Sequence, residues 1–300
     1  MVPAKYQGAC WVLIAACFYA GTALLGKWLH LLQIPIVTAF SWRYAIAALI
    51  FSILYQFQKA QDLPWESKIR CFSIGFLGDT TRSMLFFITV SRLGASLASL
   101  LLYTFPFFIF LIQRFVFRRA ATRMQWLGLL ISSFGCVLAI APLQDGGIAW
   151  DGLGIVTGIG VGLIQAGYIS YSDHFIRGIP TLTLTTYVMR GAFMMSFLAA
   201  LSKGVLALPH NSTEWMLALS LAICATAAPI FCLMKGIRMT GATQTSLLLM
   251  IEPVVTMGLA FMIYGEPLTL TKILGGFLII GSAWLIQRKP PQEALQTTQI

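Results

Sequence analysis

Five charged residues lie deep inside stretches that are otherwise apolar. Asp79 and Arg82 stand three residues apart in "GFLGDTTRSMLFF" (75–87), and Arg43, Arg190 and Glu252 each lie about nine or ten residues from the end of an apolar run. A charged side chain at the centre of a membrane helix costs about 2.5–3.5 kcal/mol on the insertion scale. Charges at such depth therefore predict a functional site, and we expect all five to bind substrate.

Uncharged polar residues at helical spacing accompany these charges. Tyr103, Gln165 and Tyr168 fall on polar stripes of their segments, and we expect them to share the wall of a cavity with the charges. Pro106, Pro229 and Pro253 interrupt predicted helices, and each removes a backbone hydrogen bond. We interpret these prolines as points where helices bend during a conformational change; a static kink is the alternative.

The predicted cluster sums to three positive and two negative charges. This balance favours a zwitterionic ligand whose carboxylate pairs with an Arg and whose cationic end faces Glu252 or Asp79. Alternatives stay open for each residue. Asp79 and Arg82 share a helix face and could neutralise one another, Arg43 and Arg190 could brace the fold, and Glu252 could instead carry a proton.

The segments that must position these residues are long enough to cross a bilayer. The chain has 300 residues, of which 58% are hydrophobic and 10% charged, and a span needs about 20 apolar residues. Ten predicted helices follow: 8–28, 34–57, 71–91, 95–117, 124–143, 152–172, 181–202, 214–235, 242–264 and 271–287. Twelve of the 20 basic residues fall on one side and four on the other, which predicts cytoplasmic termini. The tail 288–300 reads as disordered.

An internal repeat divides the chain. "GASLASLLLYTFP" (94–106) and "GATQTSLLLMIEP" (241–253) share seven of thirteen positions at an offset of 147. We therefore predict an all-α integral membrane protein with ten transmembrane helices in two five-helix repeats, 1–143 and 144–287. Because five is odd, the second repeat must be inverted. Inverted repeats are typical of alternating-access transporters with a midplane site, although a duplication without transport is the alternative.

The chain resembles the EamA-type branch of the drug/metabolite transporter superfamily. The residues that carry this resemblance are Arg43, Pro106, Glu252-Pro253 and "GEPLT" (265–269), followed by a Gly-rich last helix. The resemblance implies a central cavity, fifth and tenth helices at the periphery, and export of small metabolites. Arg118-Arg119 stand where the first repeat would be expected to carry Gly-Glu.

The sequence predicts a secondary transporter of a small zwitterionic or amphipathic metabolite, such as an amino acid or S-adenosylmethionine. We expect export across the inner or plasma membrane by alternating access. Uptake by exchange, or a non-transporting sensor or channel, is the alternative. No enzymatic motif, cofactor site or metal-ligand spacing is found in the sequence, and nucleic acid is not an expected partner. The expected partners are the bilayer and a small molecule; proton coupling and homodimerisation stay open.

Overall fold

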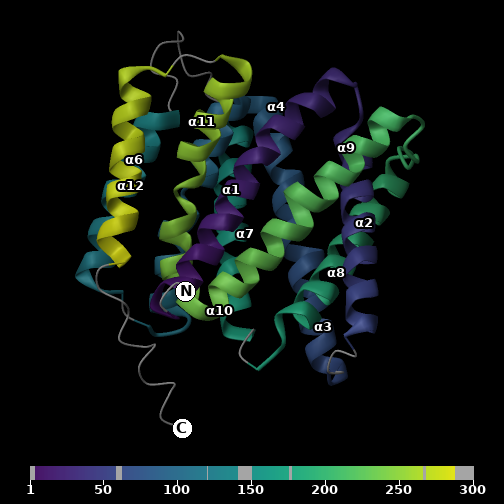
Figure 1. Ribbon diagram of the computed structural model, residues 1–300, viewed down its shortest axis with the longest axis horizontal. Helices are drawn as coiled ribbons and strands as arrows, with labels where there is room; N and C mark the ends of the chain where they lie inside the picture. The colour runs from purple at the N-terminus through teal and green to yellow at the C-terminus, as the bar shows by residue number, and fades with distance from the viewer. Residues whose placement is uncertain are drawn as a thin grey trace.

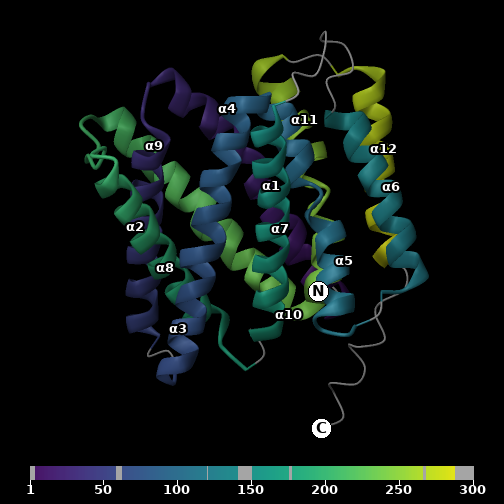
Figure 2. The same cartoon turned by 180° about the vertical axis from the view of Figure 1, so that it is seen from behind.

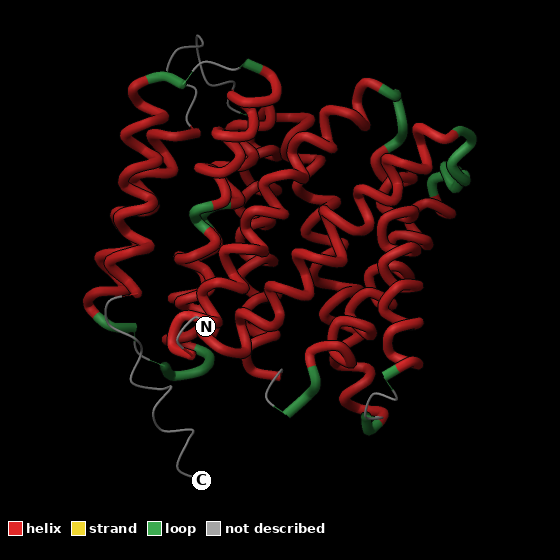
Figure 3. Tube along the Cα trace, viewed as in Figure 1, coloured by secondary structure: helices red, strands yellow, loops and turns green. Residues whose placement is uncertain are grey.

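Helices form every regular element in the described part of the chain (Figure 3). The computed structural model describes residues 4–58, 63–119, 121–140, 151–175, 178–265 and 268–287. Its α-helices and two π-helical segments, η1 and η2, are α1 (Ala4–Leu31), α2 (Ile36–Phe57), α3 (Trp65–Ser73), η1 (Ile74–Asp79), α4 (Thr80–Leu102), α5 (Phe105–Phe115), α6 (Arg123–Ile140), α7 (Gly152–Phe175), α8 (Thr181–Ser202), α9 (Ser212–Ala222), η2 (Ile223–Ala227), α10 (Ala228–Leu249), α11 (Glu252–Tyr264) and α12 (Leu270–Gln287).

The described helices overlap each of the ten predicted spans. Six stretches are long and apolar enough to cross a membrane by length and composition, and α11 and α12 supply shorter apolar helices. A helix pairs its own backbone N–H and C=O groups, and a membrane span needs this because hydrocarbon offers no hydrogen-bond partners. The chain is therefore an all-α membrane protein. The predicted boundary at 143/144, the predicted disordered tail 288–300 and Glu266 of the "GEPLT" motif lie outside the described residues.

The packing of the helices follows the repeat. Helix α1 packs along α10, and its repeat equivalent α7 packs along α4; α2 pairs with α8, and α6 pairs with α12. Both views of the ribbon place α6 and α12 together at one edge and α2 and α8 at the other (Figures 1 and 2). The first helix of each repeat thus packs against the opposite repeat, and helices of both repeats form the centre of the molecule.

Glycine allows the backbones of facing helices to approach closely. A Cβ atom on Gly75 would collide with the Val188 carbonyl of α8, and one on Gly191 would collide with the Phe72 carbonyl of α3. On α7, Gly158 lies against Leu101 and Gly162 lies against Thr104. These glycines therefore form a face of α7 against which α4 and the start of α5 pack closely.

The spans that carry Pro106 and Pro253 are interrupted rather than bent. These two prolines lie in the first turns of α5 and α11, where a missing N–H leaves no intrahelical bond unmade. The prediction that each proline removes a mid-helix hydrogen bond is wrong for these two. Pro229 differs, because α9, η2 and α10 follow one another without a break and Pro229 lies just after the π-helical turn η2. Gly94 and Gly241, which are repeat equivalents, both have positive φ inside α4 and α10, so the two repeats break their helices in matching places.

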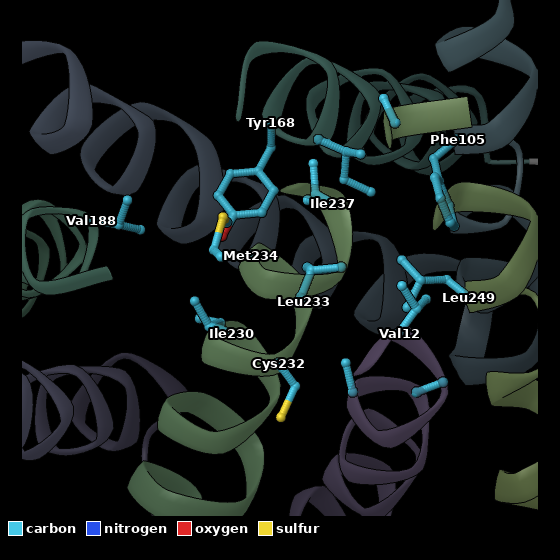
Figure 4. Close-up of a cluster of buried hydrophobic side chains, with 14 of the residues drawn as sticks. Val12, Phe105, Tyr168, Val188, Ile230, Cys232, Leu233, Met234, Ile237 and Leu249 are labelled. Atoms are coloured by element: carbon cyan, nitrogen blue, oxygen red, sulfur yellow. The ribbon is translucent and has the colours of Figure 1, made fainter. Parts of the chain in front are cut away.

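The largest buried cluster surrounds α10 at the centre of the molecule. Figure 4 shows Ile230, Leu233, Met234 and Ile237 of this helix among side chains of neighbouring helices, and Tyr168 belongs to the same cluster. Several aromatic and aliphatic residues of this cluster also border the polar site described below. The site is therefore set into the packed core.

Candidate functional site

A small cavity lies where the two repeats meet. Its volume is about 50 Å³, which is room for a few water molecules. The lining residues come from α1, η1, α4, α5, α7, α10, α11 and the α4–α5 junction: Tyr19, Asp79, Arg82, Leu102, Tyr103, Phe105, Gln165, Tyr168, Leu249 and Glu252. Two carboxylates, one guanidinium, three phenols and an amide thus share one enclosed space.

Asp79 is the centre of a hydrogen-bonded network on the first repeat. Its side chain is 2% exposed; Oδ1 accepts from Arg82 Nη2 at 2.7 Å, and Oδ2 accepts from the Tyr44 hydroxyl at 2.5 Å. Arg43 also belongs to this network: its Nη2 donates to the Tyr44 hydroxyl oxygen at 2.9 Å and lies 4.0 Å from Asp79 Oδ2. A buried carboxylate is tolerated when it is paired and hydrogen-bonded. The network therefore holds both arginines charged at depth, with a net charge of +1.

Glu252 supplies the second negative charge from the other repeat. It opens α11 directly after the break that follows Leu249, and Tyr103 is its hydrogen-bonding neighbour in the cavity. Negative charge is favoured at a helix N-terminus by the helix dipole. The break in the helix thus both exposes Glu252 to the cavity and places it at an electrostatically favourable position.

Three lining polar atoms have no hydrogen-bond partner in the described part of the chain. They are Arg82 Nε, Gln165 Oε1 and the Tyr168 hydroxyl oxygen, and all three are buried. Buried polar atoms are nearly always satisfied, so these atoms are placed to bind a ligand or water. The set contains a cationic donor, an amide acceptor and a hydroxyl that can do either.

The structure brings together six of the eight residues expected to bind substrate. Asp79, Arg82, Tyr103, Gln165, Tyr168 and Glu252 all line the cavity. Arg43 does not line it but lies behind Asp79. Arg190 does not line it either: its Nε donates to Ser52 of α2 at 3.1 Å. The alternative that the two arginines brace the fold agrees with these contacts, since Arg43 pairs with Asp79 and Arg190 contacts Ser52. The charged residues that line the cavity, Asp79, Arg82 and Glu252, sum to −1, and Arg43 behind them brings the sum to zero.

Sequence reasoning missed the remaining lining residues, Tyr19, Leu102, Phe105 and Leu249, and the buried partner Tyr44. Two pairs carried a usable signal, because Leu102 and Leu249, and Phe105 and Glu252, differ by the repeat offset of 147. The repeat thus places the same two positions of each half at the cavity. Tyr44 carried no such signal, since the hydrogen bond joins residues 35 positions apart on different helices.

No group of three or more His, Cys, Asp or Glu residues in the described ranges is placed to hold a metal ion. The chemistry offered by the cavity is instead recognition of charge and hydrogen bonding inside a membrane. A polar cavity between two repeats, bordered by broken helices, is typical of membrane transporters.

Comparison with known proteins places this transporter in a family. The model of the EamA-like transporter family matches residues 6–141 and again 152–288, so the chain belongs to that family. The two matches also bear out the predicted two-repeat organisation and the resemblance seen in the sequence.

The curated relatives are named as transporters, and their names give no substrate. The chain is 27% identical to the uncharacterized transporter YdfC of Bacillus subtilis (strain 168), over 79% of this chain and 76% of that protein. It is 22% identical to YcbK of the same organism, over 89% and 88% respectively. A solved crystal structure with 16% identity matches 98% of this chain and 99% of its own with a TM-score of 0.80, which shows the shared fold.

Proposed function

We propose that the protein transports a small zwitterionic metabolite, such as an amino acid or S-adenosylmethionine, through the cavity between its repeats. The observation that carries this proposal is the separation of charge in the cavity. Asp79, Arg82 and Arg43 together carry +1, whereas Glu252 carries −1 on the other repeat. A ligand with both an anionic and a cationic group complements such a site.

Each end of the ligand has a partner. Arg82 offers the buried Nε to the anionic group, and a charge-assisted bond of this kind is stronger than a neutral one. Glu252 faces the cationic group, while the rings of Tyr19 and Tyr168 border the same space and can contact a cation by their faces. Gln165 and Tyr168 provide uncharged hydrogen bonds.

The cavity must widen to hold such a ligand, because about 50 Å³ accommodates only a few water molecules. We propose alternating access, in which the breaks before α5 and α11 act as hinges and the repeats rock about the site. Outward movement is the proposed direction, with cytoplasmic termini as the basic residues favour. A proton carried by Glu252, or exchange with a related metabolite, would supply the driving force.

Flux in proteoliposomes tests this proposal. We expect saturable flux of at least one labelled zwitterion in a panel that also includes purely anionic and purely cationic analogues. Glu252→Gln should abolish it, because the substitution removes the negative charge that the second repeat contributes among the described residues lining the cavity. Glu66→Gln is the matched control, since this glutamate lies exposed on α3. Single-channel currents in place of saturable flux would overturn alternating access.

A further inference from the structure

Arg190 is a cation in the middle of a membrane-spanning helix, and the described residues give it no counter-charge. It lies in the middle of α8, its Nε donates to Ser52 at 3.1 Å, and its guanidinium lies 5.2 Å from the Tyr187 ring and 5.9 Å from the Tyr55 ring. No ion pair of Arg190 is found in the part of the chain that the structure describes. The repeat-equivalent Arg43 differs, because Asp79 and Tyr44 surround it.

The position of Arg190 on α8 is at the edge of the molecule. Arg190 continues a stripe of exposed apolar residues on the same helix face: Met194 (45% exposed), Leu198 (45%) and Leu201 (57%). Spacings of four, four and three residues keep these side chains on one face. Helix α8 lies with α2 at the edge opposite α6 and α12 (Figures 1 and 2). The stripe therefore faces lipid.

The N-terminal end of α8 lies on the basic side of the protein. Arg238 donates to the Ile179 carbonyl just before this helix, and α3, which carries Lys68 and Arg70, packs against α8. Arg190 is nine residues from Thr181, so its Cα atom lies about 13.5 Å along the helix. Side chains on a helix lean toward its N-terminus, and a long cationic side chain can extend to the headgroup region.

We propose that Arg190, flanked by Tyr55 and Tyr187, binds the anionic headgroup of a phospholipid from the leaflet on the basic side. The guanidinium would take the phosphate oxygens in a bidentate pair, and the two rings would stand beside it. An acyl chain would run from there along Met194 and Leu198 toward the midplane. This lipid site is separate from the transport cavity, since Arg190 does not line it.

Thermal unfolding of the purified protein in a neutral detergent tests the proposal. Added phosphatidylglycerol should raise the unfolding midpoint of the natural protein more than phosphatidylcholine does, because a ligand of the folded state stabilises it. Arg190→Gln should lose at least half of this difference, and Arg190→Lys should keep more of it because the positive charge remains. Arg114→Gln is the matched control, since Arg114 is an exposed cation at the end of α5.

Other arms of the experiment separate the possible outcomes. Glu252→Gln should keep the full phosphatidylglycerol effect, so failure of the proposed transport site would not affect this result. If Arg190→Gln does not fold, Tyr187→Leu should reduce the effect by removing one flanking ring. An unchanged effect in the folded Arg190 or Tyr187 variants would overturn the proposal. So would inorganic phosphate that stabilises the natural protein as well as phosphatidylglycerol does, since the site would then serve a soluble anion.

Discussion

At the scale of single residues, Asp79 is a buried carboxylate held by two hydrogen bonds. Both of its oxygens are bonded, one by Arg82 on the same helical segment and one by Tyr44 on α2. The Arg82 contact could be predicted from sequence, because residues three apart share a helix face. The Tyr44 contact could not, because it depends on how α2 packs against η1. The depth of Arg190 in its span likewise could not show which neighbouring helix its side chain contacts.

Substitutions at this pair distinguish a binding role from a bracing role. Asp79→Asn and Arg82→Gln should each lower stability by about 3–5 kcal/mol, as expected when one partner of a buried ion pair is removed. The double variant Asp79→Asn/Arg82→Gln should recover part of that stability, measured by thermal or denaturant unfolding, and not all of it because Arg43 stays buried without its Asp79 partner. It should still lack substrate binding, because Arg82 Nε is lost from the cavity. Recovery of transport together with stability would assign the pair a purely structural role.

At the scale of elements, the decisive features are the interruptions in the helices. The repeat and the hydrophobic pattern predicted every span, but they did not predict η1, η2 or the breaks after Leu102 and Leu249. Hydrophobic periodicity indicates how long a helix is and which of its faces is apolar. A π-helical turn or a break depends instead on backbone hydrogen bonds that tertiary packing selects. A proline at the second position of α5 and α11 was the available signal for the two breaks, whereas the proline of α10 follows the π-helical turn η2 without a break.

Close packing between α3 and α8 provides a test at this scale. Gly191→Ala should destabilise the protein by about 1–3 kcal/mol, because the new methyl group collides with the Phe72 carbonyl and a packed backbone must move. Gly167→Ala on α7 is the control, since a Cβ there meets no atom within 4 Å. The control should be neutral or stabilising by up to about 1 kcal/mol. Equal unfolding midpoints for the two variants would contradict the packing described for α8.

The start of α7 gives a prediction for pH. Asp151 accepts from Arg92 Nη1 at 2.9 Å and from the N–H groups of Leu153 and Gly154. The Arg92 hydrogen bond, with the two backbone bonds, lowers the pKa of Asp151. A carboxyl whose pKa falls on folding stabilises the fold above its unfolded value, about 3.9, and loses this effect as pH falls through the lower folded value.

Asp151→Asn checks this sign, because asparagine keeps a good helix cap but cannot form the ion pair. The midpoint difference between natural protein and variant should stay constant from about pH 7 to 5 and shrink below about pH 4. A difference that already disappears near pH 6 would show that another group is responsible.

At the scale of the whole molecule, the repeats are interlocked across the cavity. Ion pairs join both ends of α7, in the second repeat, to the first repeat. Asp151, just before α7, pairs with Arg92, and Asp173 pairs with Arg119 at 2.6 Å. Helix α1 packs in turn on α10 and α11 of the second repeat. The inverted architecture could be predicted from an odd number of spans per repeat, but this exchange of first helices could not, because the repeat fixes each half without fixing how the halves pack.

The central claim is that opposite charges on the two repeats recognise the two ends of one ligand. The direct measurement is calorimetric binding of a transported zwitterion and of its analogue without the amino group, to the natural protein and to Glu252→Gln. The natural protein should prefer the zwitterion by about tenfold or more, equivalent to about 1.4 kcal/mol, and Glu252→Gln should bind both compounds about equally. A preference that is unchanged in Glu252→Gln would contradict the claim.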